Sequence, residues 1–373
     1  MTQQTLSEDE LIRIIRRTVK SRGRVRLGIG DDAAVLRDGT VITTDAYAEG
    51  VHFDLSYMSL RQVGERCACG AISDVVAMAA EPAAVLVALA LPRASSEQLA
   101  ASSCRSRGEV RSLMLEARSQ ESGRGRLPAV SREPLALVVR ELYRGIESVC
   151  AEMGCEVAGG DIIVADQLML ALTVTGKTRT PKLRSGARPG DHLYVTGHLG
   201  SAEAGRILLA ACANPKSQIP NPKQIPMSQC SKLTRRHLRP VPRLAVMRAI
   251  KSRIHGLIDT SDGLATDARH LSEMSGVRIV LDAEALPVLP GVSRFCSERG
   301  LDPVGFVLGA GEDYELLFTG GQRFPDTVSG VKVTRIGSIE KGRGVRIRRD
   351  GRVLPVTVSG YDHLGVDNGK KSC

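Results

Sequence analysis

Residues 61–92 read RQVGERCACGAISDVVAMAAEPAAVLVALALP and contain both kinds of secondary structure that decide the fold. Residues 61–80 are mostly apolar and predict a buried helix. Residues 84–91 form an apolar run that predicts a strand, which Pro92 closes. A buried helix that leads into a buried strand is typical of proteins built from layers of α and β structure.

The same alternation of helical and strand patterns continues on both sides of this stretch. The segment Ser7–Glu10 is a capping box that predicts the start of a helix. The β-branched run at 40–44 predicts a strand that ends at Asp45, and residues 167–175 predict another strand. The apolar stripe within 135–153 predicts a long helix. We therefore expect an α/β protein with its helices and strands in layers.

The length of 373 residues favours two domains, at roughly 150 residues per domain. The polar segment 177–190 contains Pro and Gly and is the best boundary, which predicts an N-terminal domain at 1–180 and a C-terminal domain at 181–373. Residues 94–132 are rich in Ser, Arg and Gly, and residues 213–231 are basic and rich in Pro. Both segments are predicted to be long surface loops.

The net charge of +10 raises the question of nucleic-acid binding. Residues 213–243 hold seven basic and no acidic residues, and residues 102–133 hold seven Arg against four Glu, so these two segments account for the whole excess. Aromatic residues make up only 3% of the chain and Trp is absent, which leaves few platforms for stacking bases. We therefore expect solvated basic loops and no nucleic-acid partner.

Composition also indicates the cellular setting. No stretch approaches the about 20 apolar residues that a membrane span needs, so we expect no membrane association. The first ten residues are polar and acidic, unlike a secretory signal, which predicts a cytoplasmic protein. The nine cysteines are then expected to be thiols. We expect Cys67 and Cys69 to be core residues of the predicted helix rather than zinc ligands.

Aspartates recur where predicted strands give way to turns. They occur in GIGDD (28–32), TTD (43–45), GGD (159–161) and DTSDG (259–263), and Asp74 lies inside the apolar helix. Carboxylates at strand ends can converge at one edge of a sheet and bind hard cations through oxygen. For each one alone, an Asx turn or a helix cap is the favoured interpretation, and only the set as a whole favours metal binding. Asp74 does not fit that interpretation, because a carboxylate in an apolar helix needs a positively charged partner.

Other motifs restrict the chemistry. The glycines beside the aspartates expose backbone N–H groups to phosphate, whereas P-loop and protein-kinase motifs are absent. An ATP site here would therefore use magnesium and aspartate. No Gly-x-Ser-x-Gly segment supports a nucleophile. His52 is either a ligand or an ordinary loop residue. The segment Gly311–Glu315 either directs a Glu at a ligand or starts a solvated strand.

Taken in order, these motifs resemble the thiamine-monophosphate kinases, a family of the aminoimidazole-ribonucleotide-synthetase-like superfamily. The matching segments are GIGDDAAVL (28–36), TD and EGVHF (44–53), SDVVAM (73–78), LALP (89–92), ELYRG (141–145), GGD (159–161), RSGARPGD (184–191), HLRP (237–240), DTSDGL (259–264), GEDYELL (311–317) and GYDH (360–363). Each motif is modest, but the ordered set spans nearly the whole chain and is specific.

The resemblance implies a two-domain fold and a homodimer whose N-terminal domains pair through their sheets. It also implies that ATP phosphorylates thiamine monophosphate to thiamine diphosphate with the help of several magnesium ions. The acceptor is a phosphate monoester whose oxygen is already anionic at neutral pH, so no general base is required. Magnesium and an arginine would instead neutralise and align the two anionic substrates.

Carried over motif by motif, the resemblance assigns roles to individual residues. Those that would hold magnesium are Asp32, Thr43, Thr44, Asp45, Asp74, Asp161, Asp259 and Asp262. Those that would contact ATP are Tyr143, Gly160, Asp161, Arg184 and Ser261. Those that would contact the thiamine substrate are His52, Glu312 and Tyr361. Asp74, Asp161 and Arg184 would take the catalytic roles.

Some positions depart from the family pattern, and related families of the superfamily stay open. The Thr and Arg usual after Asp161 are absent, Ala71 replaces an Asn, and the connection from Pro92 to Glu141 is much longer. A hydrogenase-maturation carbamoyl-dehydratase also ends in Cys, as this chain does at Cys373, but the flanking Pro-Arg is missing. The fold would also suit an enzyme of the aminoimidazole-ribonucleotide-synthetase type or a non-catalytic binding protein.

Overall fold

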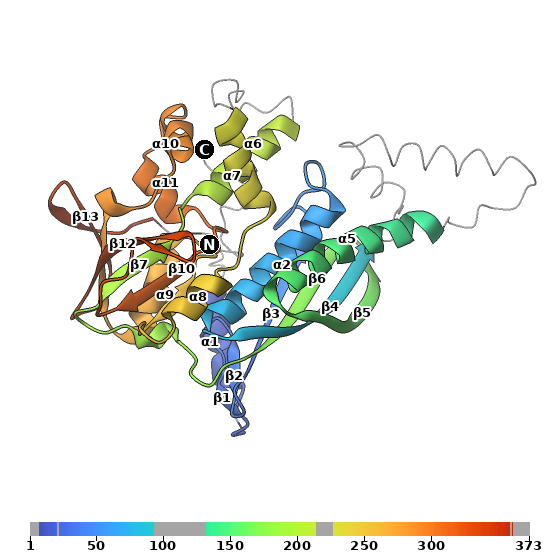
Figure 1. The fold of residues 1–373 in the computed structure, drawn as a ribbon, viewed down its shortest axis with the longest axis horizontal. Helices are drawn as coiled ribbons and strands as arrows, with labels where there is room; N and C mark the ends of the chain where they lie inside the picture. The colour runs from blue at the N-terminus through green and yellow to red at the C-terminus, as the bar shows by residue number, and fades with distance from the viewer. Residues whose placement is uncertain (1–6, 21, 93–131, 214–226, 359, 361–373) are drawn as a thin grey trace, which may run out of the picture.

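Two β-sheets lie side by side in the computed structural model, which describes residues 7–20, 22–92, 132–213, 227–358 and 360 (Figure 1). Within these residues the first sheet has the strand order β1-β2-β3-β6-β4-β5. Its strands are β1 (Val25–Leu27), β2 (Ala34–Leu36), β3 (Thr40–Ala48), β4 (Glu81–Pro92), β5 (Glu156–Ala165) and β6 (Met169–Lys177). The pairs are antiparallel except for β4 and β5, which run parallel and are joined through α5.

The second sheet follows in the sequence and has the order β14-β13-β9-β12-β7-β10-β8, with β11 paired to β12. Its strands are β7 (His192–Thr196), β8 (Leu257–Asp259), β9 (Arg278–Asp282), β10 (Leu316–Gly320), β11 (Thr327–Val328), β12 (Val331–Glu340), β13 (Gly344–Arg349) and β14 (Arg352–Pro355). Helices and strands thus form layers, as the alternating sequence patterns predict.

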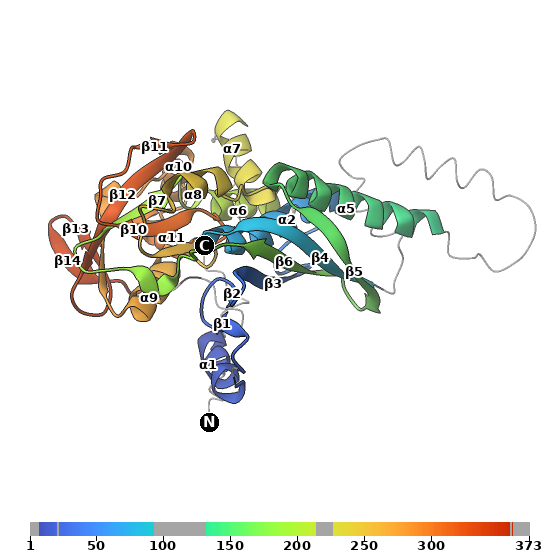
Figure 2. The ribbon, with the colours of Figure 1, turned by 60° about the horizontal axis from the view of Figure 1, so that its bottom comes forward.

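The helices of the described residues pack against the two sheets, and α1 stands apart at the N-terminal end (Figure 2). They are α1 (Glu8–Thr18), α2 (Leu60–Ala77), α5 (Arg132–Met153), α6 (Ser201–Ala213), α7 (Met227–Leu238), α8 (Leu244–Ile250), α9 (Leu264–Ser275), α10 (Pro290–Ser297) and α11 (Pro303–Gly309), with short 3₁₀ turns at Arg184–Gly186 and Ala283–Ala285. No helix in the described part of the chain is long and apolar enough to cross a membrane.

Helices α2 and α5 cover one face of the first sheet, and two glycines allow them to approach closely. A Cβ atom on Gly64 would lie 2.1 Å from the carbonyl oxygen of Leu142, and one on Gly145 would lie 2.1 Å from that of Arg61. Both positions are therefore restricted to glycine by the backbone of the facing helix.

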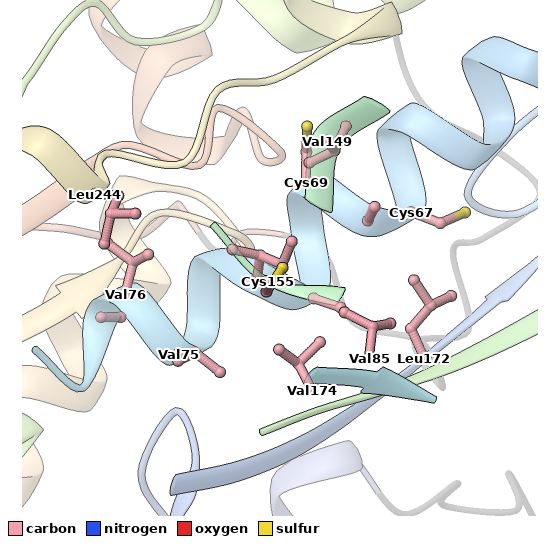
Figure 3. Close-up of a cluster of buried hydrophobic side chains, with 14 of the residues drawn as sticks. Cys67, Cys69, Val75, Val76, Val85, Val149, Cys155, Leu172, Val174 and Leu244 are labelled. Atoms are coloured by element: carbon pink, nitrogen blue, oxygen red, sulfur yellow. The ribbon is translucent and has the colours of Figure 1, made fainter. Parts of the chain in front are cut away.

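The core of this layer is formed by the apolar side chains that the sequence places on α2 and on alternate strand positions. Figure 3 shows Val75 of α2 beside Val85, Leu172 and Val174 of the sheet. Cys67 and Cys69 are also buried in this core, which confirms the prediction that they are core thiols. Burial of each such valine side chain stabilises the fold by about 1.5–3 kcal/mol.

Several predicted elements are confirmed and some need correction. The capping box at Ser7 and the strand at 84–91 are present, and the buried helix predicted at 61–80 spans Leu60–Ala77. The strand predicted to end at Asp45 continues to Ala48, because Asp45 pairs with Leu172 of β6 within an unbroken ladder.

Both predicted loops lie largely outside the described residues. Residues 93–131 and 214–226 are not described. The prediction of a loop was wrong for residues 227–231, which begin α7. The prediction that the basic residues of 213–243 are solvated was also wrong for Arg236 and Arg243, because both side chains form ion pairs with the buried carboxylate of Glu315.

Candidate active site

Three aspartates from distant parts of the chain converge between the two sheets. Asp32 precedes β2, Asp74 lies in the last turn of α2, and Asp259 ends β8. Each offers one carboxylate oxygen, and these oxygens lie within 4.8 Å of one another. Asp32 and Asp259 are buried and Asp74 is half-buried. The sequence therefore predicted the members of this cluster, and the tertiary structure brings them together.

Each carboxylate of the cluster has a different partner. Asp74 Oδ2 accepts a hydrogen bond from Thr43 Oγ1 at 2.8 Å, and Asp259 Oδ2 accepts one from Ser73 Oγ at 2.6 Å. Asp32 Oδ1 pairs with the Arg184 guanidinium, whose Nη2 donates at 2.6 Å and Nε at 3.1 Å. Asp32 Oδ2 is buried without a hydrogen-bond partner among the described residues.

Burial and mutual repulsion raise the pKa values of these groups. Burial raises the pKa of Asp74 well above its usual value, and the neighbouring charges of Asp45 and Asp259 raise it further. Burial and the charge of Asp32 raise the pKa of Asp259 to about 8. Burial also raises the pKa of Asp32, although Arg184 opposes this effect. Three carboxylates this close need added positive charge before all can be ionised at neutral pH.

The raised pKa of Asp259 predicts that ionisation of this carboxylate lowers the stability of the metal-free protein as the pH rises. The folded state binds this proton more tightly than the unfolded state, so Asp259 contributes stability below about pH 4 and loses it as pH rises through about 8. In EDTA, the gain in Tm of Asp259→Asn over wild type should therefore increase between pH 5 and 8. Differential scanning calorimetry of both proteins checks this, and a gain that stays constant or shrinks over that range would contradict it.

The remaining predicted metal ligands divide between the two faces of the first sheet. Neighbouring strand residues point to opposite faces. Thr43 and Asp45 lie on the face covered by α2, where Thr43 contacts Asp74 and the Asp45 charge raises the Asp74 pKa. Thr44 lies on the opposite face, where its hydroxyl contacts Thr173 Oγ1 at 2.8 Å. The alternation rule alone could have shown that these three consecutive residues cannot share one face.

Asp161 and Gly160 lie apart from the aspartate cluster in this chain. Asp161 pairs with Ala88 of β4 and shares the open face with Thr44, while Gly160 pairs with Val87. Together with Tyr143 these residues line a separate shallow pocket. Because β6 and β4 separate β5 from β3, the distance from Asp45 to Gly160 is three strand spacings, or about 14 Å.

A single large cleft of about 2030 Å³ collects most of the other predicted residues. Asp32, Asp45 and Asp74 line it, together with Arg184. The predicted thiamine contacts His52 and Glu312 line the same cleft, as do Ser261 and Asp262. Tyr361 lies outside the described residues, although the adjacent Gly360 lines the cleft. The cleft therefore joins six of the eight predicted metal ligands, all except Asp161 and Asp259, to two of the three predicted substrate residues.

Asp262 belongs to a second group rather than to the three-aspartate cluster. Asp262, Asp267 and His270 each offer one ligand atom, and these atoms lie within 4.8 Å of one another. Asp267 is buried and accepts a hydrogen bond from Gly263 N at 3.1 Å. Sequence reasoning missed Asp267 and His270, although their spacing of three residues on α9 places them on one helix face.

Asp31, the first aspartate of the GIGDD segment, is a further residue of the cleft. Its two carboxylate oxygens each lie 3.3 Å from the Arg184 backbone N–H, which donates to them. Burial, followed by the charge of Asp32, raises the pKa of Asp31 to about 7. The doubled aspartate in the GIGDD segment was the signal that could have indicated a second carboxylate at this position.

The three carboxylates of the Gly311–Glu315 segment lie in three different surroundings. Glu312 lines the cleft. Asp313 is buried and accepts hydrogen bonds from the backbone N–H groups of Gly200 and Ala202, at 2.6 and 3.0 Å, at the start of α6. Glu315 is buried between arginines. The hypothesis of a solvated strand start was therefore wrong for Asp313 and Glu315.

Comparison with known proteins places this cleft in a family context. Residues 30–110 and 125–178 match the family described as AIR synthase related protein, N-terminal domain. The thiamine-monophosphate kinase of Aquifex aeolicus is 31% identical over 367 residues, covering 98% of this chain and 100% of that protein. The enzyme of the same name from Methanopyrus kandleri is 32% identical over 349 residues, covering 92% of this chain and 93% of that protein.

Solved structures show the same relationship. The structure of AaThiL complexed with AMPPCP and TMP superposes with a TM-score of 0.74 at 30% identity, covering 96% of this chain and 97% of that one. The HypE–HypF complex superposes with a TM-score of 0.64 at 17% identity, covering 93% of this chain and 98% of that chain. That second likeness concerns the fold alone.

Proposed function

This chain belongs to the thiamine-monophosphate kinase family, and we propose that it transfers the terminal phosphoryl group of ATP to thiamine monophosphate, which forms thiamine diphosphate. The observation that carries this proposal is the single cleft that joins the aspartate cluster and Arg184 to His52 and Glu312. A cytoplasmic location is part of the same proposal.

The donor set fits a divalent metal ion. The cluster offers carboxylate and hydroxyl oxygens, which magnesium prefers, and one of them, Asp32 Oδ2, is buried without a partner among the described residues. Asp32, Asp74 and Asp259 would hold the ion, with Asp45 and Thr43 beside them. When bound, magnesium supplies charge neutralisation for the phosphates. Asp262 is proposed as a ligand of a separate ion.

The chain's own residues have little covalent chemistry to perform. The phosphate monoester acceptor has a second pKa near 6, so its attacking oxygen is anionic at neutral pH and needs no base. The problem is to align two anions. Arg184 lies at the cluster and can neutralise a nucleotide phosphate, while His52 and Glu312 bind and orient the acceptor at the other part of the cleft.

A homodimer is supported by the face and the edge of the first sheet that no other described residues cover. Leu86 is 43% exposed there, and Ile162, Ile163 and Val164 of the edge strand β5 are 55–60% exposed. Such an apolar surface is typical of a protein interface. A second copy on this face would cover these residues and bring another polypeptide close to Gly160 and Asp161, which we propose as ATP contacts. It would also lie near Thr44, a proposed magnesium ligand that lines the large cleft as well.

The two-domain division is also a proposal. The first sheet ends at Lys177 and the second begins at His192, so residues 1–180 and 181–373 would each contain one sheet. The aspartate cluster draws its members from both parts, since Asp32 and Asp74 lie in the first and Asp259 in the second. Catalysis would then depend on the relative placement of the two domains.

The direct test is a coupled assay with purified protein, ATP, magnesium and thiamine monophosphate. We expect thiamine diphosphate and ADP in equal amounts. The alternative of a carbamoyl-dehydratase predicts no thiamine diphosphate and no consumption of ATP that depends on thiamine monophosphate. A binding protein on this fold would show no turnover with any of these substrates. Absence of thiamine diphosphate from the wild-type reaction would contradict the proposed function.

Glu312 is expected to determine affinity for the acceptor. Its carboxylate lines the cleft and can offset the positive thiazolium ring, so Glu312→Gln should raise the KM for thiamine monophosphate at least about tenfold. The KM for ATP should stay within about twofold, because the aspartate cluster is unchanged. Initial rates with each substrate varied in turn check this. A change confined to the KM for ATP would show that Glu312 does not contact the thiamine end.

A further inference from the structure

One buried arginine contacts both sides of the proposed thiamine site. His52 lies in the turn after β3, and Glu312 lies in the loop before β10, so the site's two walls come from opposite halves of the chain. Arg66 lies on α2, is 1% exposed and does not line the cleft. It lies behind the wall that these two residues form.

The guanidinium of Arg66 reaches three separate segments. Its Nε donates to the His52 carbonyl oxygen at 2.9 Å, and its Nη1 donates to the carbonyl oxygen of His237 at the end of α7. Its Nη2 forms an ion pair with Glu312 Oε1 at 2.5 Å. A planar guanidinium can hold these two carbonyl oxygens and the carboxylate together, through two hydrogen bonds and one ion pair, whereas the single ammonium of lysine cannot reproduce that geometry.

The conformation of Glu312 needs such support. Its φ of +65° lies in the left-handed region, which is unfavourable for a residue other than glycine, and its backbone N–H donates to Ser261 O at 2.7 Å. On the side-chain end, His237 Nδ1 lies 4.0 Å from Glu312 Oε2. The side chain remains 26% exposed, so Arg66 holds it from behind while it still faces the cleft.

We propose that Arg66 is a positioning residue that fixes the spacing and orientation of His52 and Glu312 and thereby determines affinity for the thiazolium end of the acceptor. This inference rests on the proposed function. Arg66 acts through the two residues it holds. Its loss should therefore weaken acceptor binding more than nucleotide binding, because Arg184 and the aspartate cluster lie elsewhere in the cleft.

The test compares Arg66→Lys and Arg66→Met with a matched arginine outside the cleft. Arg239 follows α7 and pairs with Glu152 of α5 at 2.6 Å and with Glu65 of α2 at 3.7 Å. Arg239→Met therefore removes two ion pairs from the same region without changing a residue that lines the cleft. We expect the KM for thiamine monophosphate to rise at least about tenfold in Arg66→Met and by less in Arg66→Lys. The KM for ATP should stay within about twofold, and Arg239→Met should keep both wild-type values.

A double variant separates positioning from general damage. If Arg66 acts partly through Glu312, the KM increase of Arg66→Met with Glu312→Gln should be smaller than the product of the two single increases. The Tm of every variant is measured. If Arg66→Met does not fold, the two KM values of Arg66→Lys test the proposal. Unchanged acceptor KM, or equal increases in both KM values with a lowered Tm, would overturn the positioning role. Wild-type protein that makes no thiamine diphosphate would instead overturn the proposed function itself.

Discussion

Replacing Asp74 with Asn is expected to leave the protein folded and to lower kcat by about 10³-fold or more. Asp74 is a half-buried carboxylate whose pKa is raised, chiefly by burial and then by the charge of Asp45. Asn keeps the size of the side chain and an oxygen that can accept the hydrogen bond from Thr43 Oγ1. It removes only the charge that a bound cation needs.

The stability of the metal-free variant should accordingly hold or rise, because an amide in this position costs less than an unpaired carboxylate. The magnesium requirement should increase sharply, and the rise in Tm on adding magnesium and ATP should shrink. Asp191→Asn is a matched control, since Asp191 is also buried but pairs with His255 at 2.9 Å outside the cleft. Wild-type activity and a full ligand-induced Tm shift in Asp74→Asn would exclude Asp74 as a ligand.

Replacing Arg184 with Met is expected to have the second largest effect. It should increase the stabilisation of the protein by magnesium and decrease kcat/KM for ATP. In the structure Arg184 neutralises Asp32, at 2.6 Å between Nη2 and Oδ1. Its loss leaves a buried carboxylate without its counter-charge, so the Tm of the metal-free protein should fall. A cation can replace that charge, so magnesium should raise the Tm of the variant more than that of wild type.

The use of ATP by the same variant should be impaired. Without the guanidinium, kcat/KM for ATP should fall by about 10²-fold or more, because a positioned cation that faces phosphate contributes that order of stabilisation. Calorimetric titration with magnesium and with ATP separates the two effects. Arg348→Met is the control, since Arg348 pairs with Asp282 on the second sheet, away from the cleft. Weaker magnesium binding in Arg184→Met would show that Arg184 assists the metal site rather than substituting for a cation.

The sequence by itself determined the local elements and the identity of most cluster members. The apolar run of 61–80 and the β-branched run at 40–44 encode α2 and β3 through short-range periodicity, which depends only on neighbouring residues. A charge at Asp74 within an apolar helix is likewise visible in the sequence, because burial of that helix follows from composition. The ordered motifs indicated the family without any coordinates.

Only the tertiary structure decided which of these groups meet. Ser73 and Asp259 are in hydrogen-bond contact although 186 positions separate them, and no local pattern encodes that distance. The register of β3 in the sheet places Asp45 on the face that α2 covers, where its charge raises the pKa of Asp74. The same register places Thr44 on the opposite face. The order of the strands placed Gly160 about 14 Å from Asp45, and Asp161 on the same distant strand. Strand order and register depend on long-range packing, which periodicity cannot supply.

The partners of charged residues were decided in the same way. Glu312 was predicted as a ligand-facing carboxylate, but its contact with Arg66 arises from α2 packing against a loop of the other sheet. Arg236 and Arg243 read as part of a basic segment, yet both pair with Glu315 in the interior. A charged side chain is costly to bury alone, so its partner is fixed by the packing of whole elements and becomes visible only when those elements are in place.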